Sequence, residues 1–309
     1  MEKISYQGWP NCYRLSNSAV ELIVTADVGP RIMRYGFVGS ENQFREVPEF
    51  LGKTGGEEYR SYGGHRLWIA PEHRVRTYQH DNSPVAVEAI PGGLRALQPT
   101  ERLTGIQKEM EIRLDADGSG VRIVHRLHNR GVWEIETAPW ALSVMAPGGT
   151  AITPLPPRGT HSEDLLPVST LILWSYTDLS DPRWHFGRRY VSLRQDPQAT
   201  VPQKMGMPML DGWAAYLNRG QLFIKKFRYH TGATYPDMGS SFEFFTNAKM
   251  LEMESLAPLG KIEPGAFLEH EERWSLFRDV KLDSLDDDEI DRVVRTLATE
   301  EQRTQSREI

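Results

Sequence analysis

Short runs of alternating apolar and polar residues dominate the chain, and Gly, Pro, Asn or Asp residues interrupt them. A two-residue period is typical of β-strands that bury one face. Because no regular strand–helix rhythm is present, we do not expect a parallel α/β sheet. The sequence therefore predicts an all-β protein built from antiparallel sheets. The expected strands are residues 20–26, 31–38, 85–90, 106–114, 120–128, 133–143, 171–176, 189–193, 212–218, 221–229, 241–246, 249–256 and 267–277.

A helical pattern is clear only near the C-terminal end. Ser284 can cap a helix whose first turn is acidic, which suits the positive end of the helix dipole. Apolar residues then recur at helical spacing, and we expect this stripe to pack on the outside of a sheet. The stripe consists of Ile290, Val293, Val294 and Leu297. The predicted organisation is one β domain, residues 1–283, followed by a helix and a polar tail, residues 284–309, whose last ten residues are expected to fray.

Composition and charge narrow the class of partner. The chain has 309 residues, of which 39% are apolar and 25% charged, as in ordinary globular proteins. Its net charge of −6 is spread along the sequence, so we expect no nucleic-acid partner. No apolar run approaches the ~18 residues of a membrane span, so we expect no membrane partner. The first residues lack a signal-peptide pattern and Cys12 is the only cysteine, which favours a cytoplasmic location.

Two carboxylates stand two residues apart in an apolar run, residues 249–259. On a strand, Glu252 and Glu254 would project from one face while Leu251 and Met253 face the other way. Burying an unpaired carboxylate costs several kcal/mol, so a pair on one face indicates a polar cleft more than a core.

A second dense segment is residues 62–73. Gly63 and Gly64 permit a tight turn, and His65, Arg66, Trp68 and Glu72 follow. An aromatic face beside hydrogen-bonding groups is what a sugar ring needs. The simpler alternative is a strand with a buried tryptophan and exposed charges.

Lys225 lies between Phe223 and Phe227 on one face of an expected strand. If that face is buried, its ammonium needs an anion, and we favour this inward, paired arrangement. The candidate anions are Glu243, Glu252 and Glu254. The alternative is a lysine stem that passes its apolar neighbours to reach water.

The remaining motifs carry weaker signals. Asp237 lies in a turn sequence after Tyr235. His270 shares a strand face with Glu272 and Trp274, and the simpler interpretation of this strand is a charged strand at the surface. The nine histidines show no metal-binding spacing, and neither a phosphate-binding loop nor a nucleophile elbow is present. We therefore expect neither a metal nor a cofactor.

Several segments, in order, resemble the galactose-mutarotase-like (aldose 1-epimerase-like) superfamily, and a bacterial branch of it in particular. They are Gly29-Pro30-Arg31-Ile32, Gly63-Gly64-His65-Arg66-Leu67-Trp68, Leu251-Glu252-Met253-Glu254-Ser255-Leu256-Ala257-Pro258-Leu259, Pro264-Gly265 and His270-Glu271-Glu272-Arg273-Trp274. The resemblance spans about residues 20–277. It implies a β-supersandwich, with large twisted antiparallel sheets packed face to face, few short helices and a sugar-binding cleft on a concave surface.

The resemblance also implies chemistry. Epimerases of this family open the sugar ring with a glutamate base and a histidine acid. Glu252 or Glu254 occupies the base region, and Glu254 is preferred because it lies nearer the turn at Pro258. In the segment that corresponds to the family's strand with the acid histidine, Pro139 and Trp140 stand where the resemblance leads us to expect a histidine and an aromatic residue. The possible substitute acids are His65, Lys225 and Tyr235.

The predicted function is therefore that of a carbohydrate-active protein of the aldose 1-epimerase type, with a small carbohydrate as its partner. A non-catalytic sugar-binding protein that lacks the acid ranks almost equally. A glycoside hydrolase or lyase ranks third, and it would need an opposing acid from Glu72, Asp237 or Glu243. The sequence predicts no oligomeric state. The expected substrate-binding residues are Arg31, Arg66, Trp68, Glu72, Trp213, Tyr235, Asp237 and Glu243, and the expected catalytic residues are Glu254, Glu252, Lys225 and His65.

Overall fold

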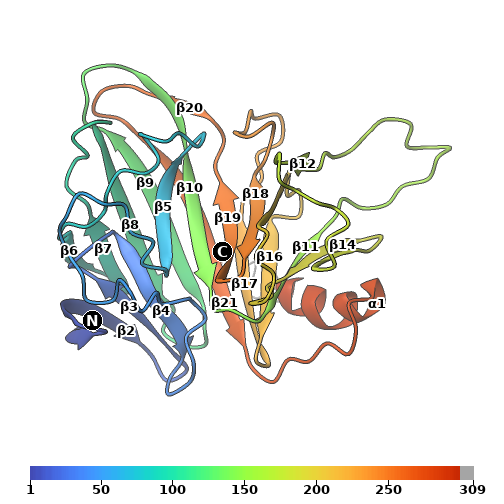
Figure 1. Ribbon diagram of the computed structural model, residues 1–309, viewed down its shortest axis with the longest axis horizontal. Coiled ribbons are helices and arrows are strands. Elements are labelled where there is room, and N and C mark those ends of the chain that lie inside the picture. Colours follow the sequence, from blue (N-terminus) through green and yellow to red (C-terminus); the bar gives the residue numbers. More distant parts are fainter. Residues whose placement is uncertain (300–309) are drawn as a thin grey trace.

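Two large antiparallel β-sheets pack face to face in the computed structural model, which describes residues 1–299 (Figure 1). The first sheet has 11 strands, of which β20 pairs only with β10 at one end. In spatial order its strands are β1 (Glu2–Tyr6), β2 (Trp9–Ser16), β3 (Val20–Thr25), β4 (Arg31–Phe37), β5 (His65–Ala70), β10 (Ile135–Met145), β19 (Met250–Leu256), β18 (Phe242–Asn247), β15 (Gln203–Met207) and β12 (Ile172–Leu173), with β20 (Gly260–Ile262) beside β10.

The second sheet has 10 strands. In spatial order they are β13 (Trp184–Phe186), β14 (Tyr190–Arg194), β11 (Thr150–Pro154), β16 (Trp213–Asn218), β17 (Gln221–Phe227), β21 (Phe267–Phe277), β9 (Val121–Asn129), β8 (Ile106–Leu114), β7 (Gly93–Leu97) and β6 (Ala86–Ile90). The hairpin between β8 and β9 turns at residues 115–120. The predicted all-β supersandwich is therefore confirmed.

The main core lies between the two sheets and receives alternate residues of the central strands. Leu251 and Met253 of β19 join it together with Phe223 of β17 and Ile123 of β9. Each fully buried side chain of this size contributes about 1.5–3 kcal/mol, so the register of β19 is strongly specified. The opposite face of β19 is consequently turned away from the core.

A short helical segment covers the outer face of the second sheet, at the right of Figure 1. It consists of α1 (Asp287–Ile290) and a π-helical turn, η1 (Asp291–Arg295). Ile290 and Val294 pack against Trp213 and Ile224, so the predicted apolar stripe and its position are confirmed.

The start of this helix differs from the prediction. Asp286, not Ser284, is the N-cap residue, and it makes no side-chain capping hydrogen bond. Ser284 instead donates a hydrogen bond to the carboxylate of Asp286. The expected fraying of residues 300–309 concerns positions outside the described residues. Within residues 1–299, no helix has the length and apolarity to cross a membrane.

Candidate functional site

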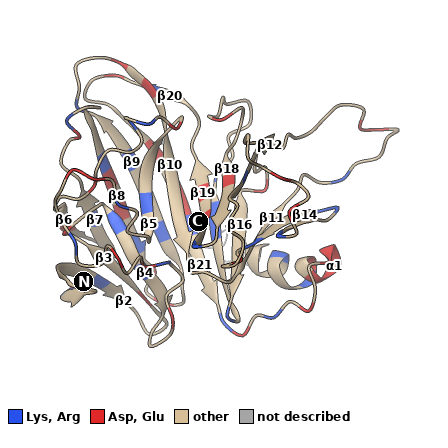
Figure 2. Cartoon of the chain, viewed as in Figure 1, with Lys and Arg blue, Asp and Glu red and all other residues tan. Residues whose placement is uncertain are grey.

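Strand register brings residues of five neighbouring strands, four of them charged, onto one outward face. Arg66 of β5 lies opposite Leu142 of β10, Leu142 lies opposite Glu254 of β19, and Glu254 lies opposite Glu243 of β18. Lys204 of β15 lies opposite Phe245, two residues beyond Glu243 along β18. Since side chains alternate along each strand, all these positions share the face opposite to the core. Figure 2 shows the basic position of β5 and the acidic position of β18 on either side of β10 and β19.

A pocket of about 250 Å³ opens over this face. Its volume equals that of about eight water molecules at ~30 Å³ each, so it suits a single sugar ring more than a chain. The lining residues are Tyr59, Ser61, Arg66, Trp68, Glu72, Tyr78, Trp140, Leu142, Tyr176, Lys204, Phe245, Met250, Glu252 and Glu254.

Aromatic side chains form one side of the pocket. The rings of Trp68 and Trp140 lie 5.3 Å apart in an edge-to-face arrangement, and Trp68 lies 5.0 Å from Tyr78. Tyr59 contacts Tyr78 in the same way at 5.1 Å. Edge-to-face contacts of this kind contribute about 0.5–1.5 kcal/mol each beyond burial, so the wall is held rigidly.

Arg66 fixes one polar edge of the pocket. Its guanidinium lies 4.0 Å from the centroid of the Trp68 ring, and it donates hydrogen bonds to Glu252, at 3.2 Å, and to the hydroxyl of Tyr59. Arg66 and Glu252 therefore neutralise each other inside the pocket wall.

Glu254 is a buried carboxyl group that lines the pocket. Its Oε2 accepts hydrogen bonds from Trp140 Nε1, at 3.0 Å, and from Lys204 Nζ, at 3.1 Å. Burial raises the pKa of Glu254 to about 7, and the charge of Glu252 adds to this effect while Lys204 opposes it. A carboxyl group with a pKa near neutrality can both accept and return a proton, as general acid–base catalysis requires.

Lys204 is buried between two tryptophans and two carboxyl groups. Its Nζ lies 4.7 Å from the Trp140 ring and 4.8 Å from the Trp174 ring, and it forms an ion pair with Glu243 at 2.7 Å. Burial opposes the charge, but Glu254 and Glu243 raise the pKa of Lys204 well above its ordinary value. Burial raises the pKa of Glu243 as well, so two carboxyl groups compete for one ammonium.

Five of the residues expected at the site line this pocket: Arg66, Trp68, Glu72, Glu252 and Glu254. The expectation that Glu252 and Glu254 share a polar face is confirmed by their position opposite the core residues Leu251 and Met253. Glu243 does not line the pocket but contacts Lys204, which does.

Four expected binding residues lie elsewhere. Arg31 is buried beside β5, where it donates to Gly63 O and pairs with Asp81. Trp213 packs under the C-terminal helix on the far side of the second sheet. Tyr235 stacks on Tyr229. Asp237 lies in a turn, with a positive φ of 48°, and its side chain contacts Glu243, but it is not among the pocket-lining residues.

His65 and Lys225 point between the two sheets and do not reach the pocket. The prediction that Lys225 faces inward and is paired is confirmed, but its anion is Glu272, at 2.8 Å. The expected partners Glu252 and Glu254 belong to the opposite face of β19, and Glu243 binds Lys204 instead. Glu272 comes from β21, which neighbours β17 in the second sheet.

The carboxylate of Glu272 is the centre of a closed interior network. Trp274 Nε1 donates to it at 2.8 Å, and the hydroxyl of Ser255 donates as well. Although burial would raise it, Lys225 holds the pKa of Glu272 well below its ordinary value. The surface-strand interpretation of His270, Glu272 and Trp274 is therefore wrong, because all three are buried.

Two histidines of this network approach each other closely. His65 Nε2 and His125 Nε2 lie 2.7 Å apart, and Glu272 Oε2 lies 3.8 Å from His65 Nε2. These three side chains are near enough to share a metal ion. Two nitrogens on one tetrahedral zinc, at about 2.0–2.1 Å from the metal, would however lie farther apart than this. We therefore interpret the contact as a hydrogen bond between neutral rings.

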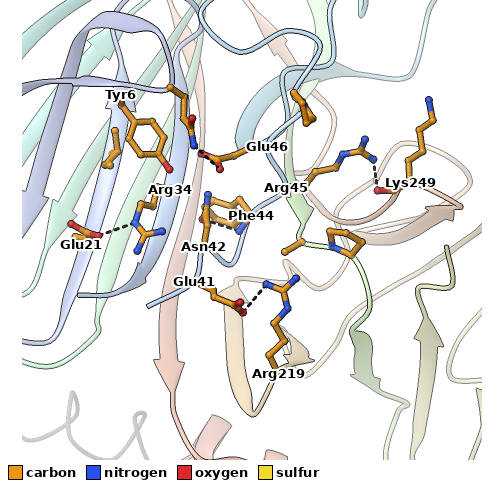
Figure 3. Close-up of a pocket in the computed structure, with 15 residues that line it drawn as sticks. Tyr6, Glu21, Arg34, Glu41, Asn42, Phe44, Arg45, Glu46, Arg219 and Lys249 are labelled. Carbon is orange, nitrogen blue, oxygen red and sulfur yellow. Dashed lines mark hydrogen bonds and ion pairs between the residues drawn. The ribbon is translucent and has the colours of Figure 1, made fainter. Parts of the chain in front are cut away.

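A larger pocket, of about 770 Å³, lies under the segment that follows β4 (Figure 3). Its charges pair with one another: Arg34 binds Glu21 at 2.8 Å and Arg219 binds Glu41 at 2.7 Å. The smaller pocket, in contrast, contains the buried carboxyl group of Glu254 beside aromatic rings. We therefore place the candidate site at the smaller pocket.

Sequence reasoning did not find Lys204, Tyr59, Tyr78, Trp140 or Tyr176 as site residues. The segment Gln203-Lys204-Met205-Gly206-Met207 shows weak alternation, so it was not predicted as a strand. The features that could have indicated a strand are Pro202 before the segment and the alternating Met205 and Met207 within it.

The arrangement of the sheets matches known protein structures. A galactose mutarotase-like protein from Lactobacillus casei superimposes with a TM-score of 0.52 at 10% identity, over 86% of this chain and 100% of that one. The fold is that of the galactose-mutarotase-like proteins. A candidate aldose 1-epimerase from Klebsiella pneumoniae gives a TM-score of 0.58 at 13% identity, over 96% of this chain and 86% of that one.

A galactose mutarotase related enzyme from Lactobacillus acidophilus shares the mutarotase-like fold, with a TM-score of 0.55 at 8% identity, over 87% of this chain and 98% of that one. No family model matches the sequence, and no curated protein matches it. At these identities the likeness shows the fold alone.

Proposed function

We propose that the protein binds a monosaccharide in the pocket of Glu254 and interconverts its anomers by opening and closing the sugar ring. The observation that carries the proposal is the environment of Glu254. It is a buried carboxyl group with a pKa of about 7, and it lines a pocket of about 250 Å³ beside aromatic rings. Its ionised form can remove the proton of an anomeric hydroxyl at neutral pH.

The other lining residues suit a sugar. Trp68 and Tyr78 offer apolar surface to the C–H groups of a ring, and Arg66, Glu72 and Glu252 offer donors and acceptors to its hydroxyls. Arg66 and Glu252 bind each other already, so their orientation requires little ordering when a ligand arrives. The names of the proteins that share the fold agree with this class of substrate.

Polarimetry of freshly dissolved aldoses tests the proposal. With the protein, the optical rotation of at least one aldose should relax faster than in buffer alone, and the increase should be proportional to protein concentration. The E254Q variant should lose this increase. The proposal fails if no aldose of a broad panel relaxes faster with the protein than without it.

A sugar-binding protein without catalysis is the second candidate. The observation that favours it is the residue beside the base: Trp140 contacts Glu254 where the family resemblance leads us to expect the acid histidine segment. This candidate predicts saturable binding of a monosaccharide, measured by titration calorimetry, with unchanged relaxation of optical rotation.

A further inference from the structure

The pocket contains a candidate base, Glu254, but no histidine that could donate a proton to the ring oxygen of the sugar. Ring opening adds a proton to the ring oxygen while another leaves the anomeric hydroxyl. His65 is buried between the sheets, where it binds Ser143 Oγ at 2.9 Å. No histidine lines the pocket in the part of the chain that the structure describes.

The pocket offers few proton donors other than Lys204. Arg66 does not lose its proton under ordinary conditions and is held by Glu252. The hydroxyl of Tyr78 donates a hydrogen bond to Glu72, and the hydroxyl of Tyr59 accepts one from Arg66. These side chains are thus engaged in the pocket wall, whereas Lys204 contacts Glu254 itself.

The geometry points to Lys204 as the acid that works with Glu254, an inference that rests on the proposed function. Both side chains line the pocket, and Lys204 Nζ lies 3.1 Å from Glu254 Oε2. The hydroxyl oxygen and the ring oxygen are bonded to the same carbon, so an acid and a base that touch each other can reach both. The ammonium has three N–H donors, of which Glu254 and Glu243 engage two within the described residues, so one remains for a ligand.

The proton transfers balance within this pair. Glu254 takes the proton of the anomeric hydroxyl, a C=O double bond forms at the anomeric carbon, and its bond to the ring oxygen breaks. The electron pair of the broken bond takes a proton from the Lys204 ammonium. Glu254 then passes its new proton to the neutral amine across their hydrogen bond, and the enzyme returns to its starting state. Rotation of the aldehyde and reversal of these steps give the other anomer.

The two transfers support each other electrostatically. Glu254 and Glu243 raise the pKa of Lys204, so the amine holds its proton in the resting enzyme. When Glu254 accepts a proton, one of these two negative charges disappears and the ammonium becomes a stronger acid. Glu243 stays beside Lys204 and keeps its side chain in place, at 2.7 Å. Glu243 is accordingly a positioning residue.

Substitution of Lys204 tests the inference by the polarimetric assay. K204M should lower kcat about 100-fold or more, because general acid catalysis typically contributes factors of this size. K204R should be similarly impaired, since arginine keeps the charge but does not give up a proton. As a control, K261M removes an exposed lysine of β20 that pairs with Glu134, and it should leave activity unchanged.

Two further measurements separate proton transfer from a structural role. K204A should recover activity with added small primary amines, and the recovery should depend on the pKa of the amine. If K204M is poorly folded, K204M/E243Q removes the unpaired carboxylate while keeping Glu254. The inference is overturned if folded K204M or K204M/E243Q keeps more than about a third of the wild-type kcat, a result that leaves the proposed function standing. If the wild type itself accelerates the relaxation of no aldose, the proposed function and this inference both fail.

Discussion

Trp140 donates a hydrogen bond from its indole nitrogen to Oε2 of Glu254, at 3.0 Å. The same ring forms part of the aromatic wall of the pocket and lies over the ammonium of Lys204, at 4.7 Å. One side chain therefore orients the proposed base, contacts the proposed acid and shapes the surface that we propose binds a sugar. This relationship explains how the mutarotase-like fold can carry a tryptophan in the segment where a histidine is expected.

The activity should depend on pH through Glu254. Because the base must be ionised, kcat/KM should rise with pH around the raised pKa of about 7. Removing the indole donor with W140F should destabilise the ionised form and move the midpoint upward by about one to two pH units, since a hydrogen bond to a charge contributes about 1.5–3 kcal/mol. W68F, which removes an indole that makes no contact with Glu254, is the matched control. An unchanged midpoint in W140F would show that Trp140 does not control the base.

Substitutions of Glu252 and Glu254 should have very different effects on kcat, although the two residues occupy one strand face. E254Q removes the base and should lower kcat about 1,000-fold. E252Q leaves Arg66 without its anion, at 3.2 Å in the wild type, and should mainly raise KM. Steady-state polarimetry of both variants measures the difference. If E252Q shows the larger loss of kcat, the two roles are reversed.

The interior pair of Lys225 and Glu272 should be important for stability. E272Q leaves a fully buried ammonium without an anion, and removal of one partner of such a pair typically costs about 3–5 kcal/mol. The double variant K225M/E272Q removes both charges and should recover much of this loss. Urea denaturation of the three proteins measures the free energy of unfolding. Equal losses in E272Q and the double variant would contradict the pairing.

Acid should destabilise the protein through its interior histidines. Burial lowers the pKa of His65 and His125, and it lowers that of His270 to about 3. Since these groups take up protons near pH ~6.5 only after unfolding, stability is present above that pH and falls as pH decreases toward the folded pKa. Each such group contributes up to about 1.4 kcal/mol per pH unit in this range. Urea midpoints at about pH 7 and about pH 5 check the direction, and a higher midpoint at the lower pH would contradict it.

The alternation of apolar and polar residues was enough to predict the sheets and the outward face of Glu252 and Glu254. It also predicted that Lys225 faces inward. It could not identify Glu272 as the partner, because β17 and β21 are neighbours only through the strand order of the second sheet. Local pattern fixes which face a residue occupies, whereas partners across strands depend on topology.

Lys204, at the pocket, is a second residue whose partners the local sequence pattern could not identify. Its strand, β15, is short and follows a long irregular segment, so its sequence carried little periodicity. The residue becomes informative only once β15 pairs with β18 and brings the ammonium to Glu243 and Glu254. Conversely, His65 and Arg66 are both residue types that often act in binding or catalysis, and the sequence does not distinguish between them. Alternation along β5 places only Arg66 at the pocket.

The most direct test of the account measures exchange between the α and β anomers of an aldose at equilibrium, by NMR exchange spectroscopy, with wild-type protein and with E254Q. For at least one aldose, the account predicts an exchange rate that rises linearly with the concentration of wild-type protein and stays at the buffer value with E254Q. An exchange rate that wild-type protein leaves unchanged for every aldose, or that E254Q raises as much as the wild type does, would contradict it.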